Sequence, residues 1–230
     1  MSRPALLLLS LCLLLLSGMA GADGYRPQPF HARYSVHVNG LKVGEIDRNL
    51  RIEADGRYVL ENLAYTTGLV ALFKKDRALE RSTWVYNDDH VKPIEYFAHY
   101  TGRAKDVIER LDFDWQRNIV SSLRDGKITE VTLVPGAMDK LMHQAVLRGD
   151  VAAGMQHIEY PIADRDDIKP YVYDVLDSEE VVTGRGTVRA IKVRKGTTTF
   201  WLAPEWDYLL VKLVQENDDS TYASYLQAEK

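Results

Sequence analysis

Hydrophobic and polar residues alternate along most of the chain from residue 30 onward. Over residues 30–38, apolar side chains occupy the even positions and polar ones the odd positions. This is the two-residue period of a strand with one buried face. Asn39-Gly40 follows and is typical of a tight hairpin turn. The return strand begins at Leu41, and its apolar positions change parity around Gly44, so we expect a β-bulge there.

The same alternation continues toward the C-terminus, interrupted by turn signals such as Asp55-Gly56 and Asp125-Gly126. Short connections of this chemistry favour an antiparallel meander, in which consecutive strands lie side by side. Further strands are predicted at residues 58–65, 78–86, 91–100, 106–115, 119–123, 128–134, 156–162, 171–176, 179–182, 187–194, 197–202, 208–215 and 221–227.

One segment follows a different period. Its apolar residues, from Met138 to Val146, recur at intervals of three and four, which predicts an amphipathic helix over residues 137–147 that Gly149 ends. A sheet of about a dozen strands twists too strongly to stay flat, and the helix has one apolar face to bury. We therefore predict a mainly β fold: a long curved antiparallel sheet, in the form of a partly closed barrel, wrapped around or capped by this helix.

Residues 1–22 differ from the rest. Arg3 precedes an uncharged, Leu-rich run over residues 5–16, and Ala20-Gly21-Ala22 follows as a small-residue cleavage site. This is the pattern of a secretory signal peptide, and its apolar run is too short to remain as a membrane span. We expect the segment to be removed, leaving residues 23–230 as a single β-rich domain with no transmembrane segment and no cysteine.

Composition narrows the class of function. Hydrophobic residues make up 46% of the chain and charged residues 27%, with both signs interspersed, so a sizeable core can form and disorder is disfavoured. Acidic residues number 33 and basic residues 29. This balance argues against a dedicated nucleic-acid-binding protein, which would usually carry a basic surplus.

Aromatic residues at alternating positions allow two interpretations. They could be ordinary core and cross-strand pairs, which strands favour, or they could line an apolar cavity inside the curved sheet. On the second interpretation, together with one methionine of the helix, the candidate ligand contacts are Tyr34, Tyr58, Trp84, Phe113, Trp115, Met142 and Phe200.

An apolar stretch without alternation covers residues 68–73 and is followed by basic residues. It could be a short buried element. It could instead be a loop at the rim of the cavity that gates a ligand or touches a membrane, with its basic neighbours near lipid headgroups. The candidates for this rim are Leu69, Val70, Leu72, Phe73, Lys74 and Lys75.

Signals of catalysis or metal binding are weak. Six histidines are present, but none has metal-ligand spacing. Asp112 and Asp114 share one face of a strand, where paired carboxylates could serve a hydrolase, although two Asp on an outer face are commoner. No nucleophile, phosphate-binding or dinucleotide motif occurs. We expect neither enzymatic activity, nor a metal, nor a cofactor.

Several motifs together resemble a family of exported bacterial proteins, the domain of unknown function 3108 (DUF3108), over nearly the whole chain after the leader. Where many members of that family carry Pro, this chain has Leu210. The resemblance implies the fold and a periplasmic location in a Gram-negative bacterium, but no activity. The layout is also similar to that of periplasmic lipoprotein carriers, whose curved sheet holds acyl chains against helices. The motifs are Tyr34-Ser35-Val36-His37-Val38, Gly40, Val43-Gly44, Pro93, Leu111-Asp112-Phe113-Asp114-Trp115, the Met138–Leu147 segment, Phe200-Trp201-Leu202-Ala203-Pro204 and Tyr208-Leu209-Leu210-Val211-Lys212.

Three hypotheses of function follow. The first is a non-catalytic periplasmic protein that binds or carries a lipid or other apolar ligand in the concavity of the sheet. The second is a cell-envelope interaction or scaffold protein that docks a partner through a sheet edge or through residues 68–73. The third, less favoured, is a hydrolase that uses Asp112 and Asp114.

Overall fold

The computed structural model describes residues 24–87, 90–102 and 105–228. The predicted signal peptide, residues 1–22, lies outside the described residues and stays a prediction. Within the described residues, neither α-helix has the length and hydropathy of a membrane-spanning helix.

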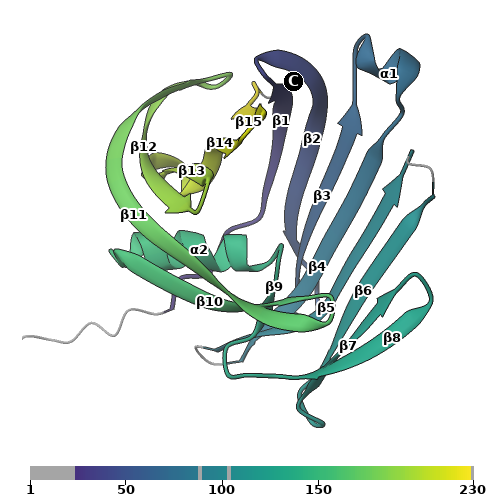
Figure 1. Cartoon of the computed structure of the whole chain (residues 1–230). Helices are drawn as coiled ribbons and strands as arrows, with labels where there is room; N and C mark the ends of the chain where they lie inside the picture. The colour runs from purple at the N-terminus through teal and green to yellow at the C-terminus, as the bar shows by residue number, and fades with distance from the viewer. Residues whose placement is uncertain (1–23, 88–89, 103–104, 229–230) are drawn as a thin grey trace, which may run out of the picture.

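Fifteen strands of the described chain form one sheet, in the order β8-β7-β6-β5-β4-β3-β2-β1-β15-β14-β13-β12-β11-β10-β9 (Figure 1). The strands of the first half are β1 (Phe30–Val38), β2 (Leu41–Ile52), β3 (Tyr58–Thr66), β4 (Arg77–Asn87), β5 (His90–Thr101), β6 (Val107–Asp114), β7 (Ile119–Arg124) and β8 (Lys127–Thr132). Those of the second half are β9 (Met138–Asp139), β10 (His157–Asp164), β11 (Asp167–Thr183), β12 (Gly186–Lys195), β13 (Thr198–Ala203), β14 (Leu209–Asn217) and β15 (Ser220–Leu226).

The chain begins and ends at the centre of this sheet. β1 pairs with β15, with Tyr34 opposite Leu226. From β1 the chain runs outward strand by strand to one edge, β8, then crosses to the other edge, β9, and returns inward to β15. The predicted meander is confirmed on both sides of the centre, because each hairpin turn returns the chain beside the strand that it has just left.

The predicted curved antiparallel sheet is confirmed, but the sheet is not closed into a barrel. β8 and β9 follow one another along the chain and remain the two edges of the sheet in the described residues. β9 pairs with β10 in parallel, which is an exception to the antiparallel arrangement. β9 lies near β5 but does not pair with it. The edge strand β9 therefore meets the first half of the sheet through side chains and not through backbone hydrogen bonds.

Bulges bend individual strands. The expected bulge near Gly44 is confirmed: the β1–β2 register shifts between Val36 and His37, which leaves Val43 as the extra residue. A Cβ at Gly44 would lie 2.5 Å from the Tyr65 carbonyl oxygen, so only glycine allows β2 and β3 to approach this closely.

The strands expected at residues 171–176 and 179–182 are instead the single strand β11. A register shift between Val175 and Ser178 bends it without ending it. The extra residue of the bulge changes the parity of the buried side chains, and this change is what made the sequence pattern resemble two separate strands.

In the part of the chain that the structure describes, three helical segments interrupt the strands. They are α1 (Val70–Phe73), α2 (His143–Ala152) and a 3-10 helix over Pro204–Trp206. The helix expected over residues 137–147 therefore begins about two turns later, and the expected end at Gly149 is wrong. The cause is Asp139, whose Oδ1 accepts hydrogen bonds of 2.8 Å from the backbone N–H groups of both Leu141 and Met142, so that a turn precedes the helix.

Gly149 lies inside α2 for a packing reason. A Cβ at this position would lie 2.5 Å from Cδ1 of Tyr25, so the segment before β1 crosses the helix in close contact. α2 lies between the two halves of the sheet (Figure 1). Its buried residues Ala145, Leu147 and Val151 share one core with β2, β3 and β4 from one half and with β11, β12 and β13 from the other.

Candidate functional site

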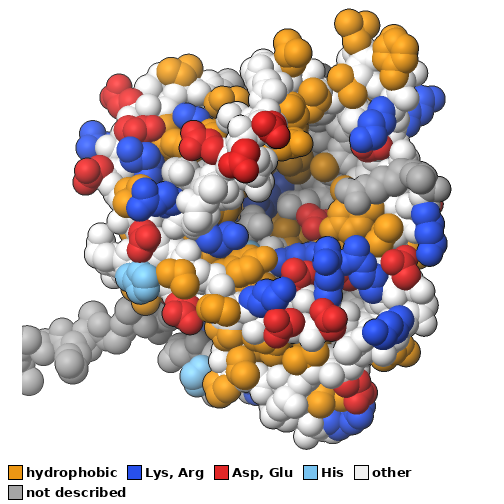
Figure 2. All heavy atoms as spheres, viewed as in Figure 1, with side chains coloured by type: hydrophobic (Ala, Val, Ile, Leu, Met, Phe, Trp, Pro, Cys, Tyr) orange, Lys and Arg blue, Asp and Glu red, His pale blue; other side chains and the backbone are white. Residues whose placement is uncertain are grey.

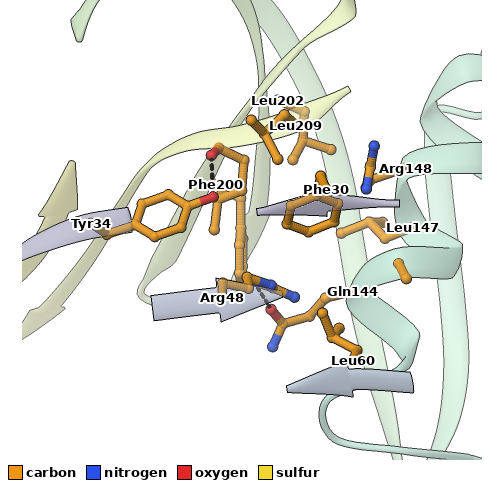
Figure 3. Close-up of a pocket in the computed structure, with 12 residues that line it drawn as sticks. Phe30, Tyr34, Arg48, Leu60, Gln144, Leu147, Arg148, Phe200, Leu202 and Leu209 are labelled. Carbon is orange, nitrogen blue, oxygen red and sulfur yellow. Dashed lines mark hydrogen bonds between the residues drawn. The ribbon is translucent and has the colours of Figure 1, made fainter. Parts of the chain in front are cut away.

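A pocket lies where α2 meets the concave face of the sheet (Figure 3). Its walls come from both halves of the sheet and from the helix, and most of them are apolar or aromatic. The lining residues are Phe30, Tyr34, Arg48, Leu60, Gln144, Ala145, Leu147, Arg148, Phe200, Leu202, Leu209 and Leu210. The cavity is small, about 20 Å³, which is room for about one ordered water molecule.

Arg48 brings a positive charge into this apolar pocket. The residue lies on β2 in phase with the buried Leu50, and only 7% of its surface is exposed. Its Nη1 donates a hydrogen bond of 2.9 Å to Oε1 of Gln144 on α2, the contact drawn in Figure 3. Burial lowers the pKa of Arg48, because leaving water disfavours the charged guanidinium.

Arg148 is the second buried guanidinium of the pocket. It lies one turn after Gln144 on α2 and reaches Asp207, donating to the carboxylate Oδ2 at 2.7 Å and to the backbone carbonyl oxygen from Nε at 3.0 Å. The same guanidinium lies over the ring of Phe30, 5.0 Å from its centroid. These contacts hold α2 against the loop between β13 and β14.

Tyr34 forms another polar contact at the pocket wall. Its hydroxyl donates a hydrogen bond of 2.8 Å to the carbonyl oxygen of Leu210, so the ring closes the pocket on the side of β1. Burial raises the pKa of Tyr34, while Arg48 and Arg148 act in the opposite direction. The hydroxyl therefore stays protonated as a donor.

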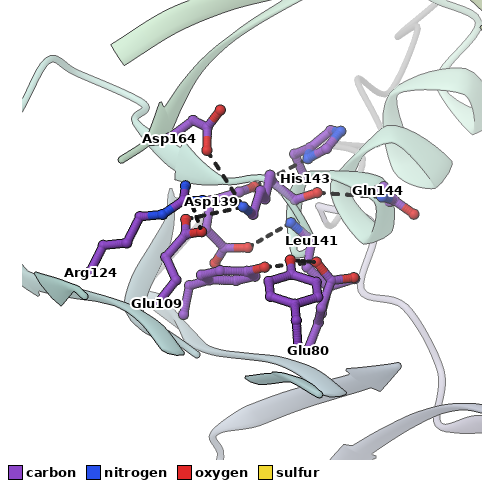
Figure 4. A network of polar contacts seen from close by, with 11 residues as sticks. Glu80, Glu109, Arg124, Asp139, Leu141, His143, Gln144 and Asp164 are labelled. Atoms are coloured by element: carbon purple, nitrogen blue, oxygen red, sulfur yellow. Dashed lines mark hydrogen bonds and ion pairs between the residues drawn. The ribbon is translucent and has the colours of Figure 1, made fainter. Parts of the chain in front are cut away.

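A second polar cluster joins β9 and the start of α2 to distant strands of the same sheet (Figure 4). At its centre the fully buried carboxylate of Asp139 accepts a hydrogen bond of 2.5 Å from the hydroxyl of Ser82 on β4. Burial raises the pKa of Asp139 to about 6, although the hydrogen bonds to its oxygens act to lower it. This hydrogen bond thus joins β9 to β4 across the concave side of the sheet.

His143 continues this cluster in a neutral form. Its Nδ1 lies 3.1 Å from the carbonyl oxygen of Asp139 and its Nε2 lies 2.7 Å from the hydroxyl of Tyr173. Nδ1–H therefore donates to the carbonyl and Nε2 accepts from the tyrosine. Burial lowers the pKa of His143 to about 3. Ser82 contacts the Asp139 carboxylate and not this imidazole, so these residues lack the serine–imidazole contact of a nucleophilic triad.

An ion-pair network lies beside the same cluster. The carboxylate of Glu109, which is almost fully buried, lies 3.0 Å from Nζ of Lys140 and 3.7 Å from the guanidinium of Arg124. Nζ of Lys140 also lies 3.5 Å from Asp164. Figure 4 labels Glu109, Arg124 and Asp164 of this network. They lie on β6, β7 and β10, and Lys140 lies in the turn between β9 and α2. They form a structural bridge across the concavity.

The predicted ligand contacts fall into two groups. Tyr34 and Phe200 line the pocket of Figure 3. Tyr58, Trp84, Phe113, Trp115 and Met142 belong to or pack against the main core instead. Tyr58 stacks on Trp84 at 5.6 Å between ring centroids, and Phe113 on Trp115 at 6.5 Å. Five of the seven therefore take part in core packing outside this pocket, and a role for them in ligand binding stays a prediction.

The predicted rim residues form an exposed apolar patch. Leu69, Leu72 and Phe73 are 78%, 72% and 91% exposed, on and beside α1 at one corner of the molecule. Figure 2 shows hydrophobic side chains projecting at this corner above a group of basic side chains. Val70 is half-buried, while Lys74 and Lys75 are exposed. Lys74 lies 2.7 Å from Asp76. The segment is thus a short exposed helix and not a buried element.

Asp112 and Asp114 alternate with the buried Leu111 and Phe113 and so lie on the other face of β6. Asp112 accepts a hydrogen bond of 2.9 Å from Arg110, and Asp114 accepts from the backbone N–H groups that begin the next turn. Neither lines the pocket of Figure 3. Within the described residues, no group of three or more His, Asp or Glu side chains could hold a metal ion.

Sequence reasoning missed the two arginines of the pocket. Arg48 stands at the parity of Ile46 and Leu50 on a strand, and a charged residue at a buried parity was the available signal. Arg148 falls on the polar face of the helix that the sequence predicts. The later start of α2 and its packing between two sheet halves bury that face as well.

Comparison with known proteins assigns a family. The sequence profile described as "Protein of unknown function (DUF3108)" matches residues 33–227. The chain belongs to the DUF3108 family. The expected resemblance is therefore confirmed. No curated protein matches the chain.

A solved structure from Brucella abortus has a similar fold. It is described as a β-barrel-like protein of the domain of unknown function DUF1849, with a TM-score of 0.59 and 12% identity, and the alignment covers 88% of this chain and 97% of that one. At this identity the likeness concerns the fold alone, and it agrees with the curved sheet of this DUF3108 member.

Proposed function

We propose that this DUF3108 protein is a non-catalytic periplasmic protein that binds an apolar, acyl-chain-like ligand on the concave side of its sheet. The observation that carries the proposal is the pocket under α2. Except for Arg48, Gln144 and Arg148, its walls are apolar or aromatic, and such walls favour an apolar guest over water.

The cavity of about 20 Å³ is too small for an acyl chain, so binding requires α2 to shift away from the sheet. Side-chain hydrogen bonds hold this segment in place: Asp139 with Ser82 before the helix, His143 with Tyr173 and Gln144 with Arg48 in its first turn, and Asp150 with Tyr160 and Arg148 with Asp207 near its end. Ligand binding must offset the loss of those that the displacement breaks. A ligand that fills the space under a displaced α2 stabilises that open state by its differential affinity. On this proposal, the conformation with α2 packed against the sheet is the closed state.

The first test is to express the full chain with its leader in a Gram-negative host, fractionate the cells and analyse the purified protein by native mass spectrometry and lipid extraction. The proposal expects the protein in the periplasmic fraction with a co-purified amphiphile. A protein that stays in the cytoplasm, or that carries no lipid and binds no added fatty acid, contradicts it.

Two substitutions in the pocket should change the affinity for an apolar ligand in opposite directions. Ala145→Phe fills the space under α2 and is expected to weaken binding at least tenfold, whereas Leu60→Ala enlarges it and is expected to preserve or strengthen binding. Each costs about 1–4 kcal/mol of unfolding free energy, so binding is compared at a temperature where urea unfolding shows both variants folded. Equal affinities for the two variants contradict binding at this site.

A second candidate function, docking at the cell envelope, is favoured by the patch of Leu69, Leu72 and Phe73. Its neighbours Lys74, Lys75 and Arg77 outnumber the one nearby carboxylate, Asp76. Apolar side chains beside a basic surplus suit the surface of an anionic membrane.

Vesicle flotation tests this docking. The wild-type protein should float with vesicles containing phosphatidylglycerol and less with phosphatidylcholine alone, and Phe73→Asp should abolish flotation. Ile128→Asp, which charges an equally apolar and 67% exposed position on β8, is the matched control. If flotation is absent while in-cell crosslinking at residue 72 traps one protein, the patch serves a protein partner instead.

A further inference from the structure

The guanidinium of Arg48 has a hydrogen-bond donor without an acceptor among the described residues. The guanidinium is buried among Leu60, Phe200 and Leu202 at the pocket wall. Its Nη1 has one neutral partner, Gln144, while its Nε is buried and has no hydrogen-bond partner among the described residues. A buried guanidinium is normally paired with a carboxylate and saturated with acceptors, because it has left water.

The charges around Arg48 do not neutralise it. Within the described residues no carboxylate forms an ion pair with its guanidinium, and Glu80 acts on it only at longer range, opposed by Arg148. Arg148 is already paired with Asp207, and its Nη1 is also buried without a partner among the described residues. The pocket lining contains two guanidinium groups and no carboxylate, so the pocket holds an excess of one positive charge.

A purely structural role for Arg48 explains this arrangement poorly. A tie between β2 and Gln144 needs only one neutral donor, which a shorter polar side chain could supply without burying a charge. The buried charge becomes useful when an anion occupies the pocket, because the interaction is strong where water is excluded.

We propose that Arg48 anchors the acidic head of the ligand, a carboxylate or phosphate, while the apolar walls around it hold the chain. This inference rests on the proposed function, because it assigns the polar end of the same amphiphile. The Nε–H of Arg48 donates to the anion, and the unpartnered Nη1 of Arg148 is a second donor on the facing helix. The ligand class is thus a single-chain acidic lipid, such as a fatty acid.

The experiment compares amphiphiles of equal chain length on the full chain, purified after export and stripped of lipid. The probes are palmitate, palmitoyl lysophosphatidic acid and palmityl alcohol, with binding measured by displacement of a fluorescent fatty acid. The wild-type protein should bind at least one acidic probe tenfold or more tightly than the alcohol. The better acid identifies the head group as carboxylate or phosphate.

Arg48→Met retains the apolar stem and removes the charge. It should bind all three probes with similar affinity, because the alcohol depends only on the apolar walls. Arg51→Met, which removes a half-exposed arginine of the same strand that pairs with Glu53, is the matched control and should retain the preference. Arg48→Lys should retain part of it. If Arg48→Met does not fold, Arg48→Gln takes its place, and the wild-type comparison already decides between acid and alcohol.

The outcomes separate this inference from the proposed function. Equal wild-type affinity for acids and alcohol, or a preference that survives Arg48→Met, overturns the anion anchor and leaves the apolar pocket intact. A wild-type protein that binds none of the three probes overturns both.

Discussion

The hydroxyl of Ser82 on β4 donates a hydrogen bond of 2.5 Å to the carboxylate of Asp139 on β9. Both residues are fully buried. They belong to strands that the sheet ladder separates widely, so this contact joins the edge of one half of the sheet to the interior of the other. A side-chain contact thus replaces the strand pairing that would close a barrel.

The first prediction concerns the protonation of Asp139. Burial raises the pKa of Asp139 from 3.8 to about 6, so between these values the folded state retains a proton that the unfolded state has lost. This group's contribution to stability is therefore complete below about pH 4 and falls as pH rises toward 6, by roughly 3 kcal/mol in total. Asp139→Asn should remove this loss of stability with rising pH.

His143 makes the stability of the protein depend on pH in the opposite direction. Burial lowers the pKa of His143 from 6.5 to about 3, so below pH 6.5 the unfolded state takes up a proton that the folded state excludes. The contribution of this group is complete above pH 6.5 and is lost as the pH falls. Between pH 6 and 4 the two slopes oppose each other, each about 1.4 kcal/mol per pH unit.

The two variants should therefore show opposite pH profiles. Relative to the wild-type protein, Asp139→Asn should lose stability on acidification from pH 6 to 4, and His143→Gln should lose it on going from pH 4 to 6. Urea unfolding monitored by Trp fluorescence across this range measures both. The double variant serves as the control, because it lacks both groups. Parallel profiles for the two single variants would contradict the assignment.

A further prediction concerns the buried pair of Glu109 and Lys140. Lys140→Met leaves the Glu109 carboxylate, 1% exposed, with Arg124 as a more distant partner at 3.7 Å. An uncompensated buried charge should cost about 3–5 kcal/mol. The double variant Lys140→Met/Glu109→Leu should recover most of this loss, because the charges that then lose a partner, Arg124 and Asp164, are partly exposed to water. Urea unfolding at pH 7 measures both, and equal losses in the single and double variants would disprove a charge effect.

The last prediction concerns Gly149 and Tyr25. Alanine favours a helix interior over glycine by about 1 kcal/mol, but at residue 149 its Cβ would clash with the Tyr25 ring. Gly149→Ala should therefore be neutral or destabilising in the wild-type background. In a Tyr25→Ala background it should stabilise the protein by about 1 kcal/mol. A double-mutant cycle from thermal unfolding measures the coupling, and additive effects would show that Tyr25 does not pack on α2.

Local patterns predicted most of the sheet. The alternation over residues 30–38 and the Asn39-Gly40 turn identify a hairpin because side-chain direction and turn geometry depend on neighbouring residues. The parity change at Gly44 predicted a bulge for the same reason. The helix was placed too early because Met138 and Asp139 fit a helical period, whereas their pairing with β10 and the contact with Ser82 come from residues distant in the sequence.

The sequence by itself therefore determined most of the strands, their turns and the family, since each depends on residues that are close along the chain. The tertiary structure alone decided that β8 and β9 remain edges, that α2 lies inside the curve, and that Arg48 and Arg148 meet beside Gln144. Such meetings depend on how a twisted sheet curves over its full width. No short segment of the chain carries that information, because the pocket forms only where both halves of the sheet enclose the helix.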